Sequence, residues 1–167
     1  MLKPALHSLF VEYELSHQTP MNRLTHKVAI PLIVFHVVAM LDWVPLFVIP
    51  GTSFVLTLAH LAVVGALGWY AAMNVKLAVW MGVFFAVCFP LGWITPRPVV
   101  VAIAIAGWLI QLAGHMVWEK KSPAFLRNMM QALVGPFFFA ALLTGDWKLG
   151  VNVAPPAAAA RPALSGL

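Results

Sequence analysis

The chain has 167 residues, of which 62% are hydrophobic and 9% charged, and it carries a net charge of +5 at neutral pH. A water-soluble domain needs about 25–35% charged residues at its surface, so this composition excludes an ordinary soluble protein. The ten Lys and Arg residues are scattered at the ends of apolar segments, and we therefore expect a lipid bilayer and no nucleic acid as the partner.

The N-terminal region, residues 1–27, predicts two helices at a membrane surface. Residues 4–18 read as a short helix, and Thr19 followed by Pro20 has the residue types of an N-cap and a first helical position. This region carries charged residues and no long apolar core, so no cleavable signal peptide is expected in it.

Long uncharged segments then predict membrane-spanning helices, since each approaches the 17–25 residues that cross a hydrocarbon core. The four clearest segments are 28–49, 52–73, 77–94 and 99–118. A fifth, 129–143, is short, contains Gly135-Pro136 and predicts either another span or a re-entrant helix. The fold class is thus an all-α integral membrane protein, a bundle of four or five transmembrane helices in residues 28–145, with residues 146–167 as a disordered tail.

The distribution of positive charge predicts the orientation. If residues 1–27 are cytoplasmic, four spans return the chain to the cytoplasm near residue 119, which places Lys120 and Lys121 inside and Arg97 outside, as the positive-inside rule requires. We expect a multi-pass protein of a bacterial inner membrane with a cytoplasmic N-terminus.

This topology brings three distant histidines to one side of the membrane: His17 and His26 before the first span, and His115 near the end of the fourth. In one continuous helix His17 and His26, nine residues apart, would point about 180° apart. The break at Thr19-Pro20 allows the two rings to converge.

Further polar residues share faces with these histidines. Gln111, His115 and Glu119 follow an i, i+4, i+8 series on an otherwise apolar helix, and Asn22 lies four residues before His26. Polar groups inside membrane helices tend to face the bundle interior and to serve a function. Imidazole and carboxylate ligands suit Fe(II), three histidines would also accept zinc, and a purely structural polar network is the alternative.

Two other functions remain open from the residues alone. His36 and His60 are expected to be hydrogen-bonded to neighbours, but as a pair they would suit a bis-histidine haem electron carrier. A non-catalytic scaffold or small transporter would use the same polar stripe to hold helices together. Cys88 is the single cysteine and can form no internal disulfide.

Two separated motifs give a family resemblance. They are Tyr13-x3-His17-x4-Asn22-x3-His26-x4-Pro31 and Gln111-x2-Gly114-His115-x3-Glu119-x3-Pro123-Ala124, the second followed by Asn128, Gln131 and Pro136. In the same order they resemble the membrane 2-hydroxy fatty acid dioxygenase family of fatty-acid α-oxidation. The resemblance covers roughly residues 10–36 and 106–138.

The resemblance implies an Fe(II) enzyme that uses O2 to shorten a 2-hydroxy fatty acid by one carbon with release of CO2. The family's motif histidines map onto His17, His26 and His115, which we expect to bind the metal. Glu119, Asn22, Gln111 and Asn128 are the expected supporting catalytic residues, which orient the ligands or complete their polar network. Chain-length preference and oligomeric state are left open.

Overall fold

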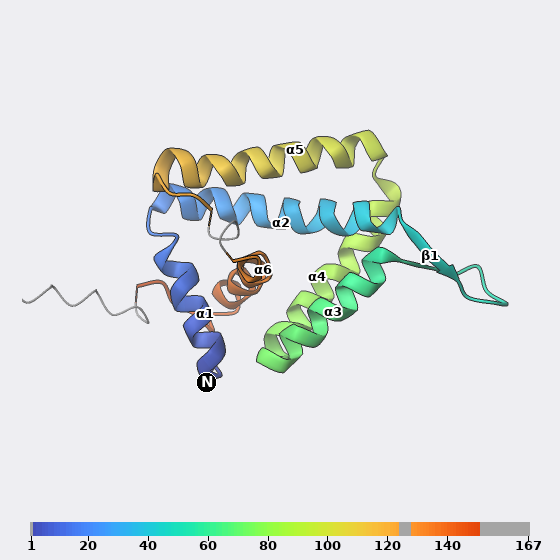
Figure 1. Cartoon of the computed structure of the whole chain (residues 1–167), viewed down its shortest axis with the longest axis horizontal. Coiled ribbons are helices and arrows are strands. Elements are labelled where there is room, and N and C mark those ends of the chain that lie inside the picture. The colour runs from blue at the N-terminus through green and yellow to red at the C-terminus, as the bar shows by residue number, and fades with distance from the viewer. Residues whose placement is uncertain (1, 124–127, 151–167) are drawn as a thin grey trace, which may run out of the picture.

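The computed structural model describes residues 2–123 and 128–150, which are mostly helical (Figure 1). The helices are α1 (Pro4–Leu15), α2 (Pro20–Asp42), α3 (Leu58–Met73), α4 (Val75–Ile94), α5 (Arg97–Ala113), the π-helix η1 (Gly114–Glu119) that continues α5, and α6 (Met130–Leu143). Two short strands, β1 (Pro45–Val48) and β2 (Val55–Thr57), join α2 to α3.

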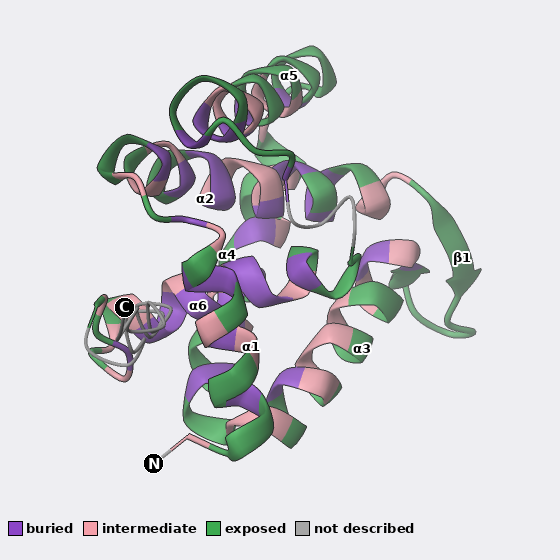
Figure 2. Ribbon diagram, turned by 60° about the vertical axis from the view of Figure 1, so that its left-hand side comes forward, coloured by how far each residue is buried: buried purple, intermediate pink, exposed green. Residues whose placement is uncertain are grey.

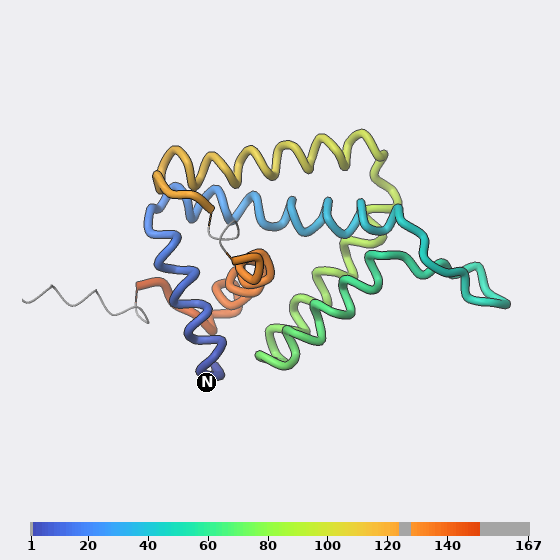
Figure 3. The backbone as a smooth tube through the Cα atoms, viewed as in Figure 1, coloured from blue at the N-terminus to red at the C-terminus, as the bar shows by residue number. Residues whose placement is uncertain are grey.

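Helices α2 and α5 run side by side in opposite directions and form the long axis of the molecule (Figure 1). Helices α3 and α4 form a hairpin, broken only at Asn74, that packs against the C-terminal part of α2. Helices α1 and α6 lie beside the N-terminal part of α2, and the tube in Figure 3 shows how sharply the chain turns between α1 and α2. The N-terminal end of α2 and the C-terminal end of α5 with η1 are therefore neighbours.

The predicted break between the first two helices is confirmed. Thr19 is the N-cap of α2, its Oγ1 accepts a hydrogen bond from the Asn22 N–H at 3.3 Å, and Pro20 is the first helical residue. Proline fits this position because its missing N–H would have no partner within the helix. Helix α2 then runs without interruption past residue 27, the boundary predicted between the surface region and the membrane bundle.

The segment between α2 and α3 differs from the prediction, which extended a helix to residue 49 and began another at residue 52. The helix instead ends at Asp42, and residues 45–57 form an antiparallel hairpin in which Phe47 pairs with Leu56 and Val48 with Val55. β-Branched and aromatic residues favour strands, and Gly51, with φ 78°, makes the turn. The all-α fold class is wrong in this one respect.

Three helices are long and apolar enough to span a membrane within the described residues: Pro20–Asp42, Val75–Ile94 and Arg97–Glu119. Helix α3 has only 16 residues because the hairpin takes residues from the start of the expected second span, and α6 has 14, close to the short segment expected from the sequence. At 1.5 Å per residue these two helices are about 24 and 21 Å long, less than a hydrocarbon core of about 30 Å. The bundle of four or five full spans is therefore not confirmed, whereas a helical membrane protein is supported.

The segment that follows α6 packs against α1. Trp147 is 2% exposed, its ring meets that of Phe10 edge-on at 5.4 Å, and its Nε1 donates to Glu14 Oε2 at 2.7 Å. Gly150 N donates to the other Glu14 oxygen at 2.6 Å. Within residues 146–150, which we expected to begin the disordered tail, Trp147 is thus buried against α1, while Lys148 and Gly150 are exposed; Figure 2 shows the buried residues of the molecule in purple. The rest of the expected tail lies outside the described residues.

Candidate metal centre

His17 and His26 are both anchored by the main chain four residues earlier. His17 Nδ1 lies 2.6 Å from the Tyr13 carbonyl oxygen, and His26 Nδ1 lies 2.8 Å from that of Asn22. A carbonyl oxygen only accepts, so each Nδ1 must carry the ring proton and donate it. The Nε2 atom of each neutral ring consequently carries a lone pair and no proton.

The three Nε2 atoms converge at one point. His17 Nε2 lies 3.1 Å from His26 Nε2, which lies 3.0 Å from His115 Nε2, and the three side chains are 4%, 4% and 1% exposed. Their ligand atoms all lie within 4.8 Å of one another. The lone pairs of His17 and His26 face each other, an arrangement that a shared cation stabilises. Two nitrogens about 2.1 Å from one ion lie about 3.0–3.4 Å apart, so the spacing fits a metal.

His115 reaches this point through a local change of helix type. Helix α5 ends at Ala113, and Gly114–Glu119 continue it as a π-helix, a feature often found at functional sites. A Cβ on Gly114 would overlap Thr25 Oγ1 and Asn22 Oδ1, so only glycine allows η1 to lie this close to α2. The predicted close approach at Gly114 is confirmed. Although the helix widens here, the predicted stripe of Gln111, His115 and Glu119 still faces the N-terminal part of α2, where each side chain contacts His26 or Asn22.

The carboxylate of Glu119 accepts hydrogen bonds from residues at the break between α1 and α2. Its Oε1 accepts from Gln18 N at 3.0 Å, and its Oε2 accepts from Thr19 N and Thr19 Oγ1, both at 3.0 Å, and from Asn22 Nδ2 at 3.2 Å. Glu119 is 8% exposed. These four hydrogen bonds fix the carboxylate. They also fix the turn between α1 and α2, and this turn allows His17 and His26 to meet.

The remaining sequence-predicted residues occupy different places. Asn22 joins Glu119 through its side chain and His26 through its carbonyl oxygen. Gln111 Nε2 lies 2.7 Å from His26 Nε2, directly beside the three imidazoles. Asn128 is exposed, and its Oδ1 accepts from Met130 N at 3.0 Å as a cap of α6.

Burial keeps the side chains of His17 and Tyr13 uncharged. Burial lowers the pKa of His17 to about 4, with the nearby His115 acting in the same direction. The Tyr13 ring stacks on the His17 ring at 4.0 Å, and burial raises the pKa of the Tyr13 phenol above its ordinary range. At neutral pH His17 therefore offers a neutral imidazole, the form that binds metals, and Tyr13 keeps its proton.

A cavity of about 460 Å³ begins at the histidines and follows α2. His17, His115, Gln111 and Gln131 line its polar end, and the rest of its described lining is almost entirely apolar. Helix α2 contributes one stripe of side chains to it: Ile30, Ile33, Val34, Val37, Val38 and Leu41. From the first to the last of these the helix axis measures about 17 Å. The cavity has the size of a small-molecule site and the shape for a long apolar chain.

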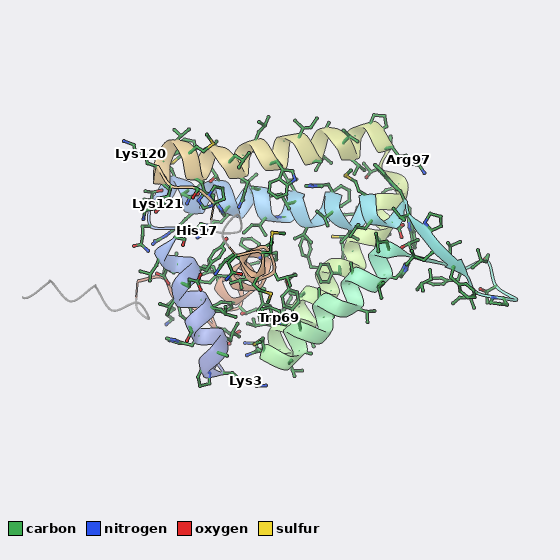
Figure 4. The ribbon with its side chains drawn as sticks, viewed as in Figure 1. Lys3, His17, Trp69, Arg97, Lys120 and Lys121 are labelled. Carbon is green, nitrogen blue, oxygen red and sulfur yellow. The ribbon has the colours of Figure 1, made fainter. Side chains whose placement is uncertain are left out.

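The ends of α5 differ in charge and in what lies beside them. His17 is at the end marked by Lys120 and Lys121, and Arg97 is at the opposite end (Figure 4). The Arg97 guanidinium lies 5.3 Å from the ring centre of Trp43. The predicted separation of these charges along α5 is thus observed, while the side of the membrane on which each end lies stays a prediction.

The other two candidate histidines have local partners. His36 Nδ1 lies 2.9 Å from the Leu32 carbonyl oxygen, and His60 Nδ1 accepts from Thr57 N at 3.2 Å. The His60 ring also packs against that of Phe89 at 4.7 Å. These contacts support the expectation that both are hydrogen-bonded to neighbours.

Two elements of the site were missed from the sequence. One is the α2 stripe that lines the cavity, which looks like any lipid-facing surface when only hydrophobicity is considered. The other is Gln131, which belongs to the resemblance but was given no role. Gln131 is an isolated amide in the apolar segment 129–143, and this could have marked it as a candidate site residue.

Comparison with known proteins gives two matches. Residues 4–147 match the family model described as Mpo1-like, 2-hydroxy-palmitic acid dioxygenase Mpo1-like. A curated relative, the 2-hydroxy-palmitic acid dioxygenase MPO1 of Saccharomyces cerevisiae, is 30% identical over 132 residues, which cover 75% of this chain and 72% of the relative. No solved structure gives a significant match.

Proposed function

Because the chain belongs to the Mpo1-like family, we propose that it is an Fe(II)-dependent dioxygenase that shortens 2-hydroxy fatty acids by one carbon. The observation that carries the proposal is the convergence of three buried imidazole Nε2 atoms at the polar end of a long apolar cavity. The name of the yeast relative supplies the substrate class. The membrane helices supply the lipid environment in which such an acid is found.

The proposed reaction balances with O2 as the only other reactant. A 2-hydroxy acid and O2 give the acid shorter by one carbon, one CO2 and one water. The bond between C1 and C2 breaks, and these two carbons together lose the four electrons that O2 accepts. No further reductant is required.

His17, His26 and His115 would hold the iron through Nε2. Neutral imidazole suits iron, and a bound Fe(II) with open positions supplies the means to activate O2 beside the substrate. The residues of the chain set the conditions for this. The Tyr13 and Asn22 carbonyls fix the proton of His17 and His26 on Nδ1, and Glu119 fixes the turn between those two rings.

The cavity places the substrate. Its α2 stripe would bury the acyl chain, and the polar end would receive the hydroxyl and carboxylate beside the histidines. Val37, one of the lining residues, is 40% exposed, and we propose that the acyl chain enters beside it from the lipid.

The proposal is tested with purified protein loaded anaerobically with Fe(II). On addition of O2 and 2-hydroxypalmitic acid, we expect consumption of about one O2 per acid and formation of the acid with fifteen carbons. His115→Ala should give no product, and His7→Ala, which changes an exposed histidine of α1, should behave as the wild type. Failure of folded, iron-loaded wild type to consume the acid would contradict the proposal.

A further inference from the structure

Two buried glutamines that line the cavity have amide atoms without a hydrogen-bond partner among the described residues. Gln131 is 3% exposed, and neither its Oε1 nor its Nε2 has a hydrogen-bond partner among the described residues. Gln111 is 8% exposed, and its Oε1 likewise has none in the described part of the chain. Both side chains line the cavity. Buried polar groups are nearly always paired, so these amides point to a polar ligand.

A chain of contacts places Gln131 at the histidine end. Gly135 follows it by one turn on the same face of α6, and a Cβ on Gly135 would lie 3.2 Å from the Tyr13 hydroxyl oxygen. The Tyr13 ring is in turn stacked on that of His17. Gln131, Tyr13 and His17 thus follow one another along the cavity wall.

The charge of the cavity determines what the amides can recognise. Among its described lining residues there is no Lys, Arg, Asp or Glu. In the described part of the wall, a carboxylate that enters would therefore be met by neutral donors rather than by a side-chain cation. A glutamine side chain offers one acceptor oxygen and two donor hydrogens, whichever way the amide is turned.

The backbone around Gln131 adds to this environment. Gln131 lies in the first turn of α6, where the helix dipole favours negative charge. Pro136 has no N–H to donate to the carbonyl oxygen of Ala132, which also lines the cavity. The backbone N–H groups of Met130, Gln131 and Ala132 are themselves paired with Asn128 and Met129, so the first turn contributes its dipole rather than free donors, and the Ala132 carbonyl offers an acceptor.

We propose that Gln131 is the specificity residue for the head group of the 2-hydroxy acid, its Nε2 donating to a carboxylate oxygen and its Oε1 accepting from the 2-hydroxyl. This inference rests on the proposed function. An acid without the hydroxyl leaves Oε1 buried and unpaired, and sites built around a substrate hydroxyl discriminate strongly against such analogues. Gln131 thereby separates 2-hydroxy acids from the ordinary fatty acids of the membrane.

The test measures binding rather than turnover. Dissociation constants for 2-hydroxypalmitic acid and palmitic acid are determined by calorimetry on the full chain in detergent, loaded with Fe(II) under anaerobic conditions. We expect wild type to prefer the hydroxy acid and Gln131→Met to lose about tenfold of that preference, with palmitic acid affinity changed less than about twofold. As a control, Leu133→Met also introduces a methionine into this cavity wall, and it should keep the preference for the hydroxy acid.

A second variant keeps the test decisive if Gln131→Met does not fold, as judged by circular dichroism. Gln131→Glu keeps the shape but sets a carboxylate against that of the ligand, so both acids should bind at least about tenfold more weakly. An unchanged preference in Gln131→Met, or unchanged binding in Gln131→Glu, would overturn the inference while leaving the dioxygenase proposal intact. If wild type binds neither acid, both proposals fail.

Discussion

Similar residues lie at the two ends of α2, but the two ends differ in how their hydrogen-bond donors and acceptors are paired. At the C-terminal end Asp42 accepts from Thr57 Oγ1 at 2.7 Å and from Trp93 Nε1 at 2.8 Å, and His60 accepts from Thr57 N. Each of these contacts pairs a donor with an acceptor, and Thr57 Oγ1 also lies 2.8 Å from His60 Nδ1. At the N-terminal end the Nε2 lone pairs of His17 and His26 face each other at 3.1 Å, although Gln111 Nε2 donates to that of His26.

The difference shows how to separate a structural polar cluster from a functional one. Each end combines a carboxylate, a threonine and histidine within an apolar protein, so composition does not distinguish them. Pairing does distinguish them, because a cluster whose donors and acceptors match needs nothing more, whereas converging acceptors and amide atoms without partners are what the proposed cation and polar ligand would pair with. The predictions below are ordered from the largest expected effect to the smallest.

The largest contrast is expected between single histidine substitutions at the two ends. His26→Ala should lower turnover by more than about 100-fold, because loss of even a supporting residue of a metal site costs roughly 10–100-fold. His60→Ala should retain turnover close to wild type at a temperature where it is folded. Oxygen consumption with 2-hydroxypalmitic acid measures both, and equal losses in the two variants would show that the ends do not differ.

Substitutions of the two carboxylates, Glu119 and Asp42, test the same difference between the two ends of α2. Glu119→Gln cannot accept all four hydrogen bonds that hold the turn before α2, so it should weaken Fe(II) binding by about 10–100-fold. Asp42→Asn should leave the Fe(II) dissociation constant unchanged. Anaerobic titration with Fe(II) gives both constants. Wild-type affinity in a folded Glu119→Gln protein would remove the positioning role of Glu119.

At the C-terminal end the expected effect is on stability. Asp42→Asn weakens two hydrogen bonds to a charged acceptor and should lower the free energy of unfolding by about 1–2 kcal/mol. Thermal unfolding in detergent, followed by circular dichroism, measures the change. A variant as stable as wild type would mean that the Asp42 contacts contribute nothing to holding the hairpin and α3 to α2.

The smallest effect is expected at the surface, where Lys76 Nζ lies 2.8 Å from Asp146 Oδ2. The hydrogen bond from Lys76 lowers the pKa of Asp146 below its ordinary value of 3.8. The stabilisation is therefore present at neutral pH and is lost as the pH falls through the lowered pKa. Because the Lys76 side chain is 58% exposed, Asp146→Asn should cost less than about 1 kcal/mol at pH 7 and abolish this pH dependence.

Much of the site could be predicted because its geometry follows from local rules. Thr19 and Pro20 are residue types that begin helices, so the break before α2 could be predicted. The i, i+4 spacing of Tyr13 with His17, and of Asn22 with His26, predicts the hydrogen bonds that fix both imidazole rings. Membrane topology alone placed His115 on their side. These features need no knowledge of packing.

The rest depended on long-range packing that the sequence does not display. The hairpin at residues 45–57 has the apolar composition of a span, and only the pairing of its strands shows otherwise. The π-helix after Ala113 arises where Gly114 meets α2, a contact between segments about 90 residues apart. The docking of Trp147 on Glu14 is equally non-local. The unpaired state of Gln131 could be recognised only once its surroundings were known.

The most direct test of the metal centre is metal analysis of anaerobically purified protein. We expect about one iron per chain in wild type and in His60→Ala, and none in His17→Ala, His26→Ala or His115→Ala variants that retain their helical content. Folded wild type that binds no metal even after incubation with Fe(II), or His17→Ala, His26→Ala and His115→Ala variants that keep their iron, would contradict the assignment of these three histidines.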